Sequence, residues 1–339
     1  MADLAPRRNT PRCATRPLPA LGAGLIAGRG RVIKEFQTHF AAHRAHSAQA
    51  PMSIEAPGHP SADPVIAEQT TQHLQSIPFM KSIDMRALKG GRDGATTVVP
   101  LSSGVTATGH AGVFSDGITA AAIDQCGSAA LTPWTGPGTA MATLSLDISF
   151  MNPAMGPQMT LHSECVAISR SVGHTRVKVV NADGTLAAHG SVNYMVGAFP
   201  GGVAPSGDRM GPEGNDTVDG QPILPLQGES FVAAIAMGEP EPGRIEIPFA
   251  ANLVGSREPT AFHGGLLAAA AIEGAKSRVP DLTLSHLLVD YLRAGNPRDL
   301  TATASLIHRS RKTATVRIDI TQDGGDRHVA TATARFVQG

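Results

Sequence analysis

The stretch "FHGGLLAAAAIEGA", residues 262–275, predicts a helix that begins directly after a His-Gly-Gly triplet. Alanine and leucine favour helices, and they fill most of its positions. The stretch carries a single acid, Glu273. A second alanine-rich run, "SDGITAAAIDQCGSAA" at residues 115–130, holds Asp124 in a similar place. Acids are seldom placed among apolar residues without a reason, so both carboxylates are candidate functional groups.

The segments that follow these two helices are similar, with an offset of about 141 residues. Each helix is followed by one strand-like segment and then by a long segment in which apolar and polar residues alternate, which is the period of a β-strand. Asp183-Gly184 and the "QDGGD" at residues 322–326 are hairpin-turn signals inside the long segments. The sequence therefore predicts an α+β fold with two units, each a helix packed on an antiparallel sheet.

The domain boundaries follow from this repeat and from composition. We expect a first domain at residues 60–198, a linker at 199–222 that is rich in Gly, Pro and Asp, and a second domain at 223–339. Residues 1–59 carry many arginines and few acids. A transit peptide would look similar, but we expect a disordered extension or a segment ahead of a true start at Met52.

Composition excludes several classes of function. Lys and Arg together number 28, as do Asp and Glu, so bulk charge attracts neither nucleic acid nor an anionic membrane. No apolar run is long enough to span a bilayer. The three cysteines lie far apart and have no metal-binding spacing, and their odd number argues against a disulfide framework. We expect a cytoplasmic protein with no metal and no cofactor.

The two halves resemble hotdog-fold proteins, in particular the PaaI-like acyl-CoA thioesterases. The resemblance rests on the His-Gly-Gly triplet, the helix acids, the strand segments "LDISFMNPA" and "LLVDYLRAG", and the hairpin "VVNADGTLAAHGSVNYMV". It implies two hotdog units in one chain, each with a curved antiparallel sheet around a central helix. It also implies an acyl-CoA substrate and the possibility of a homo-oligomer. The hydratase branch of the fold carries His five residues after its Asp, where this chain has Ala129 and Arg278.

Thioester hydrolysis explains these residue types. Attack on the carbonyl creates an oxyanion, which backbone N–H groups at a helix N-terminus stabilise. Glycine lets the substrate approach the backbone closely, and a carboxylate acts as general base or nucleophile. Gly117 and Asp124 are about 10 Å apart along their helix, and Gly264 and Glu273 about 13 Å. Neither acid reaches its own helix N-terminus, so each site must combine the two halves, as the resemblance also implies.

Two composite sites are therefore predicted, and they differ. In the family pattern the acid lies nine residues after the His. Asp124 keeps this spacing from Ser115, but Ile272 has it from His263, and Glu273 is one residue late. We expect the active site to combine His263, Gly264 and Gly265 with Asp124, and the other site to combine Ser115, Asp116 and Gly117 with Glu273. Asn252 is a further candidate for substrate contact.

Alternative interpretations remain open at this point. Asp124 could lie on a solvent-exposed helix face beside Gln125 and Ser128, and His263 could cap or pack its helix. Cys126 is expected to be a small buried residue rather than a nucleophile, because no His is near it in the motif. The whole chain could also be a non-catalytic acyl-CoA-binding or interaction protein that keeps the fold. The predicted activity is acyl-CoA thioesterase.

Overall fold

The computed structural model describes residues 64–136, 139–197, 216–257 and 259–339. These residues belong to one compact unit. The predicted N-terminal extension, residues 1–59, lies outside the described residues, as does most of the predicted linker. The described end of that linker forms a small hairpin, β9 (Thr217–Val218) and β10 (Gln221–Pro222).

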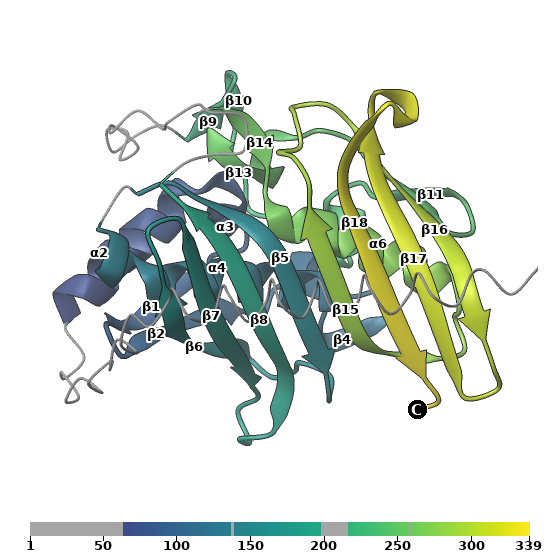
Figure 1. Cartoon of the computed structure of the whole chain (residues 1–339), viewed down its shortest axis with the longest axis horizontal. Helices are drawn as coiled ribbons and strands as arrows, with labels where there is room; N and C mark the ends of the chain where they lie inside the picture. Colours follow the sequence, from purple (N-terminus) through teal and green to yellow (C-terminus); the bar gives the residue numbers. More distant parts are fainter. Residues whose placement is uncertain (1–63, 137–138, 198–215, 258) are drawn as a thin grey trace, which may run out of the picture. The chain divides into compact units, whose positions relative to one another are not determined.

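Twelve strands form one antiparallel sheet in the order β1-β2-β6-β7-β8-β5-β15-β18-β17-β16-β12-β11 (Figure 1). Six strands come from each half, in mirrored order about the central pair β5–β15. In that pair Leu146 lies opposite Val289 and Asp147 opposite Leu288. The strands of the first half are β1 (Arg86–Gly91), β2 (Gly94–Pro100), β5 (Met141–Phe150), β6 (Gln158–Ile168), β7 (Val172–Val180) and β8 (Leu186–Val196). Those of the second are β11 (Gly238–Glu241), β12 (Arg244–Ile247), β15 (Thr283–Tyr291), β16 (Leu300–Arg309), β17 (Thr313–Gln322) and β18 (Arg327–Val337).

The alternation of apolar and polar residues in the sequence appears in these strands as an alternation of buried and exposed side chains. Along β7, Thr175, Val177 and Val179 are buried while the residues between them are exposed, because successive side chains point to opposite faces of a sheet. The β7–β8 turn contains Gly184 at φ +85°, a left-handed conformation that favours glycine. The β17–β18 turn is the short 3₁₀ helix η3 (Asp323–Gly325). Both predicted hairpins are confirmed.

Two long helices cover the same face of the sheet, one in each half (Figure 1). Helix α4 (Asp116–Thr135) packs on β6, β7 and β2, and helix α6 (Gly264–Arg278) packs on β16, β17 and β12. One side of each helix contacts the sheet, and another side contacts the partner helix. Alanine suits such a position because its small apolar side chain lets both neighbours come close. The predicted α+β fold is confirmed.

Glycine permits the close contact between the two helices. A Cβ at Gly265 would lie 2.3 Å from the Cα of Ala121, and a Cβ at Gly117 would lie 2.7 Å from the Cβ of Ala269. The two contacts are reciprocal, so equivalent positions in α4 and α6 are 148 residues apart. Asp124 in α4 therefore corresponds to Ile272 in α6, and Gln125 corresponds to Glu273.

Short elements set the position at which each long helix begins. The amide of Ser115 donates to the carbonyl of Val105, and the amide of His263 donates to that of Leu253. These bonds tie each helix start to the 3₁₀ turn that precedes it by about ten residues. The turns and their small hairpins are η1 (Ser103–Val105), β3 (Thr106–Ala107) and β4 (His110–Phe114), and η2 (Ala251–Leu253), β13 (Val254–Arg257) and β14 (Thr260–Phe262). The remaining helices among the described residues are α2 (Pro64–Ser76), α3 (Pro78–Ser82) and α5 (Phe231–Ala234).

Candidate active site

His263 caps helix α6. Its backbone is extended, and its Nδ1 accepts a hydrogen bond from the amide of Gly265 at 3.0 Å. This is the usual way in which an N-cap side chain satisfies a free helix amide. The ring is buried and packs against Phe79 of α3 at 5.3 Å between centroids. The capping interpretation of His263 is therefore correct, and the cap also fixes the Gly-Gly turn.

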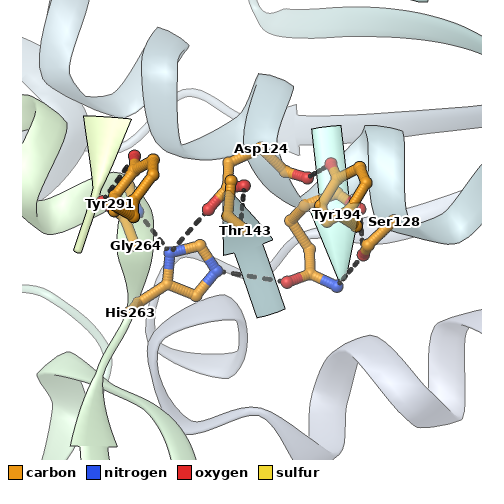
Figure 2. Close-up of polar contacts among 9 residues, drawn as sticks. Asp124, Ser128, Thr143, Tyr194, His263, Gly264 and Tyr291 are labelled. Carbon is orange, nitrogen blue, oxygen red and sulfur yellow. Dashed lines mark hydrogen bonds and ion pairs between the residues drawn. The ribbon is translucent and has the colours of Figure 1, made fainter. Parts of the chain in front are cut away.

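Asp124, in the middle of α4, meets this helix start from the other half (Figure 2). Its Oδ1 accepts a hydrogen bond from the hydroxyl of Thr143 at 2.7 Å, and the nearby Gly265 amide also favours the charged carboxylate. Its Oδ2 lies 3.8 Å from Nδ1 of His263. The side chain is 5% exposed. The solvent-face interpretation of Asp124 is wrong, because α4 is buried between the sheet and α6.

Gly264 leaves space beside that carboxylate. A Cβ there would lie 2.9 Å from Oδ2 of Asp124 and 3.4 Å from the ring of Tyr291. The Tyr291 hydroxyl donates to the Gly264 carbonyl at 3.0 Å. As the first residue of α6, Gly264 has an amide that no helical carbonyl can accept, and no other described residue accepts from it. The site thus presents a free helix N-terminal donor beside a carboxylate.

Burial sets the charges of this site. It raises the pKa of the Asp124 carboxyl to about 6, although the hydrogen bonds from Thr143 and Gly265 act in the opposite direction. Burial also lowers the pKa of the His263 imidazole to about 3. At neutral pH the two groups are therefore a carboxylate and a neutral imidazole. Their 3.8 Å approach is not an ion pair.

Three residues of this site were missed by sequence reasoning. Thr143 holds the carboxylate of Asp124, and the buried hydroxyl of Tyr194 donates to the Asp124 backbone carbonyl. Tyr291 holds the carbonyl of Gly264. Burial raises the pKa of both tyrosines well above the ordinary value, so both hydroxyls keep their protons at neutral pH. The polar residues on the strands after each helix were the available signal, but their facing could not be read from the sequence.

The second predicted composite site contains a serine cap and a cluster of charged side chains. Ser115 caps α4 by accepting from the Gly117 amide at 3.1 Å. Asp116 lies 2.7 Å from Nζ of Lys276, which is also 3.8 Å from Glu273. Burial would lower the pKa of Lys276, but these two carboxylates outweigh it and raise it. Lys276 of α6 thus pairs with two carboxylates, Asp116 at the start of α4 and Glu273 on its own helix.

Glu273 does not occupy the position in α6 that corresponds to Asp124 in α4. Its position corresponds to Gln125, and the position of the acid is taken by apolar Ile272. Asn252 lies in η2, where its backbone carbonyl accepts a hydrogen bond from Ser82 at 3.3 Å. No hydrogen bond among the described residues joins it to Asp124 or to the His-Gly-Gly turn. Cys126 is fully buried, as predicted.

Each half of the chain matches a thioesterase family model. Residues 111–188 match the model described as thioesterase superfamily. Residues 255–337 match the model described as acyl-CoA thioesterase N-terminal domain. The first range contains Asp124 and the second contains the His-Gly-Gly turn. No curated protein matches the chain.

Solved structures similar to this chain extend over both halves. A candidate thioesterase from Novosphingobium aromaticivorans aligns with a TM-score of 0.50 and 13% identity, over 74% of this chain and 98% of its own. The tesB protein of Mycobacterium avium subsp. paratuberculosis aligns with a TM-score of 0.50 and 12% identity, over 77% and 98%. The chain has the tandem hotdog fold, and each of its halves matches a thioesterase family model.

Two further observations concern other classes of protein. Within the described ranges, no helix is long and apolar enough to cross a membrane. In the same residues, no group of three or more His, Cys, Asp or Glu side chains could hold a metal ion.

Proposed function

We propose that this protein is an acyl-CoA thioesterase that hydrolyses its substrate to a free acid and CoA at the Asp124–Gly264 site. One observation carries the proposal: a buried carboxylate from one half faces a helix N-terminus of the other half, with only glycine between them. Carbonyl polarisation and water activation need these two groups side by side. The PaaI-like assignment is a finer proposal that rests on the His-Gly-Gly motif and the spacing of Asp124.

The geometry supports the following reaction. The thioester carbonyl oxygen accepts from the amide of Gly264, where the dipole of α6 adds to the stabilisation of the oxyanion. Asp124 takes a proton from water, and the hydroxide adds to the carbonyl carbon. The C–S bond then breaks, and the leaving thiolate takes the proton from Asp124. Thr143 keeps the carboxylate oriented toward Gly264 throughout.

The second candidate function is binding of acyl-CoA without hydrolysis. It is favoured for the other composite site, where Lys276 forms ion pairs with both Asp116 and Glu273. Purified protein assayed with acyl-CoAs of several lengths and with an aryl-acyl-CoA separates the two functions. Release of CoA supports the thioesterase. Thermal protection by acyl-CoA without any release would instead support a binding protein.

The pH profile of hydrolysis is expected to follow the ionisation of Asp124. The active form is the carboxylate, and its pKa is about 6. We therefore expect kcat/KM to be constant at neutral pH and to fall about tenfold per pH unit below about pH 6. His263, with a pKa of about 3, adds no step in this range. A profile that is flat down to pH 4.5 would contradict the assignment of Asp124 as the base.

Replacing Thr143 with Val is expected to move this acidic limb to higher pH. The Thr143 hydroxyl lowers the pKa of Asp124 by donating to its charged form. Its removal should shift the limb upward by roughly one pH unit. Thr303→Val, at an exposed position of β16, is the matched control and should leave the limb in place. An unchanged limb in Thr143→Val would show that the hydrogen bond does not act on the active carboxylate.

A further inference from the structure

We propose that Gln125 is a positioning residue that, with Ser128, fixes His263 in the tautomer protonated on Nε2, so that Nδ1 holds the Gly264–Gly265 turn beside Asp124. The inference rests on the hydrolysis proposed for this site. Gln125 has no role in bond making. It acts through the imidazole of His263, because Oε1 of Gln125 and Nε2 of His263 share a buried hydrogen bond at 3.1 Å.

The direction of this hydrogen bond follows first from Ser128. The Ser128 hydroxyl has one proton, which it donates to the backbone carbonyl of Gln125 at 2.8 Å. The same oxygen lies 2.9 Å from Nε2 of Gln125 and must therefore accept from the side-chain amide. That orients the amide nitrogen toward Ser128 and the amide oxygen toward His263. The amide oxygen can only accept, so Nε2 of His263 is the donor.

The same tautomer follows independently from the other side of the ring. The backbone amide of Gly265 can only donate, and it points at Nδ1 of His263 at 3.0 Å. Nδ1 must then be unprotonated, and a neutral imidazole carries its one proton on Nε2. The buried ring has no water-exposed position in which to exchange these roles. Both ends of the network favour the same tautomer, but the Gly264–Gly265 turn can move, so the Gln125 oxygen at Nε2 is the contact that fixes it.

This arrangement gives His263 a structural task in the reaction. An Nδ1 that accepts from Gly265 cannot donate to Asp124, so the imidazole takes no part in proton transfer. It keeps the Gly265 amide at the helix start, and the free amide of Gly264 then remains next to the carboxylate. If the ring took the other tautomer, its Nδ1 proton would oppose the Gly265 amide and displace the turn.

The other half of the chain lacks this network. The positions that correspond to Gln125 and Ser128 are Glu273 and Lys276, which form part of the charged cluster with Asp116. The cap of α4 is the serine hydroxyl of Ser115, which can rotate to suit its partner. Gln125, which we propose selects the tautomer, thus lies beside the histidine cap of α6, and the serine cap of α4 has no such partner among the described residues.

The test reads the tautomer of His263 directly by nitrogen NMR on the full chain labelled at histidine, with the resonance assigned by its loss in His263→Asn. In the wild-type protein we expect a protonated Nε2 and an unprotonated Nδ1 that do not titrate between pH 5 and pH 8. In Gln125→Met, which keeps the side-chain length but loses the acceptor, we expect a mixture of tautomers and a roughly tenfold lower kcat with KM within about twofold. Ser128→Ala should show the same mixture.

The outcomes are separable. Gln69→Met, on the exposed side of α2, is the matched control and should change neither tautomer nor kcat. A wild-type ring protonated on Nδ1 would overturn the proposal even if no variant folds. So would Gln125→Met with an unchanged tautomer, whatever its activity. Absence of thioesterase activity in the wild-type protein would refute the proposed function and leave the tautomer measurement intact.

Discussion

Replacing Asp124 with Asn is expected to lower kcat for acyl-CoA hydrolysis by roughly a thousandfold, which is the usual scale for loss of a positioned base. The amide has nearly the same shape and can still accept from Thr143, so the site keeps its geometry and loses its base. Steady-state kinetics with the best acyl-CoA substrate measures the effect. Residual activity near one half would mean that the Glu273 site also hydrolyses thioesters.

The same variant is expected to be more stable than the wild-type protein at neutral pH. Folding raises the pKa of Asp124 from 3.8 to about 6. As pH rises from about 4 to about 6, Asp124 ionises in the unfolded chain but stays protonated in the folded one. The free energy of unfolding of the wild-type protein therefore falls by roughly 3 kcal/mol. Asn carries no charge and escapes this loss.

Urea unfolding at pH 4 and pH 8 tests this pH dependence. We expect the two proteins to differ little at pH 4 and Asp124→Asn to be the more stable at pH 8. Asp290→Asn, at an exposed position of β15, is the control and should alter neither activity nor stability appreciably. If Asp124→Asn were inactive and also less stable at pH 8, the carboxylate would be a structural group and its catalytic assignment would fail.

The two glycines of the His-Gly-Gly turn are expected to respond oppositely to alanine. In Gly264→Ala the new methyl group would fill the space between Oδ2 of Asp124 and the Tyr291 ring. That is where the thioester carbonyl is proposed to bind, so kcat/KM should fall at least about a hundredfold. The backbone of Gly264 is not left-handed and alanine favours helices. The methyl group displaces a side chain rather than backbone, so the loss of stability should be smaller than in Gly265→Ala.

In Gly265→Ala the methyl group would meet the backbone of Ala121 at 2.3 Å. Backbone cannot rotate away, so α4 and α6 must separate, and we expect a loss of about 3 kcal/mol or more in the free energy of unfolding. Gly117→Ala, which meets Ala269 at the reciprocal contact, should show a similar loss. Thermal and urea unfolding measure the stability of each variant, and steady-state kinetics measure its activity. Together they distinguish the roles of the two glycines. If Gly264→Ala lost as much stability as Gly265→Ala, the proposal that Gly264 leaves space for the substrate would be wrong.

The fold was largely predictable because its signals are local and occur twice. Alternation over β7 and β8, the Asp183-Gly184 turn and the alanine-rich helices each define an element without knowledge of the others. The pairing of Asp124 with the His263 turn also followed, because the rise of a helix excludes a site on one helix alone. The register that assigns Ile272 to the position of the acid was readable from spacing.

What could not be predicted depends on irregular geometry and on contacts distant in sequence. Thr143 faces Asp124 because β5 has an irregularity between Thr143 and Ser145, which shifts its pairing with β8. Strict alternation from buried Leu146 would have turned Thr143 to the other face. Tyr194 reaches Asp124 from 70 residues away. The burial of Asp124, and hence its raised pKa, depends on how closely α6 packs, which no local pattern reveals.

The reciprocal contact of α4 and α6 also bears on how such a chain can evolve. Two identical units that pair symmetrically have two identical sites, and every substitution appears in both. Fusion into one chain removes this constraint, so one helix start can keep a bare glycine, at the site of the proposed hydrolysis, while the other carries Asp116 and its lysine partner. The duplicated chain can then specialise, with one copy free to serve as a scaffold for the other.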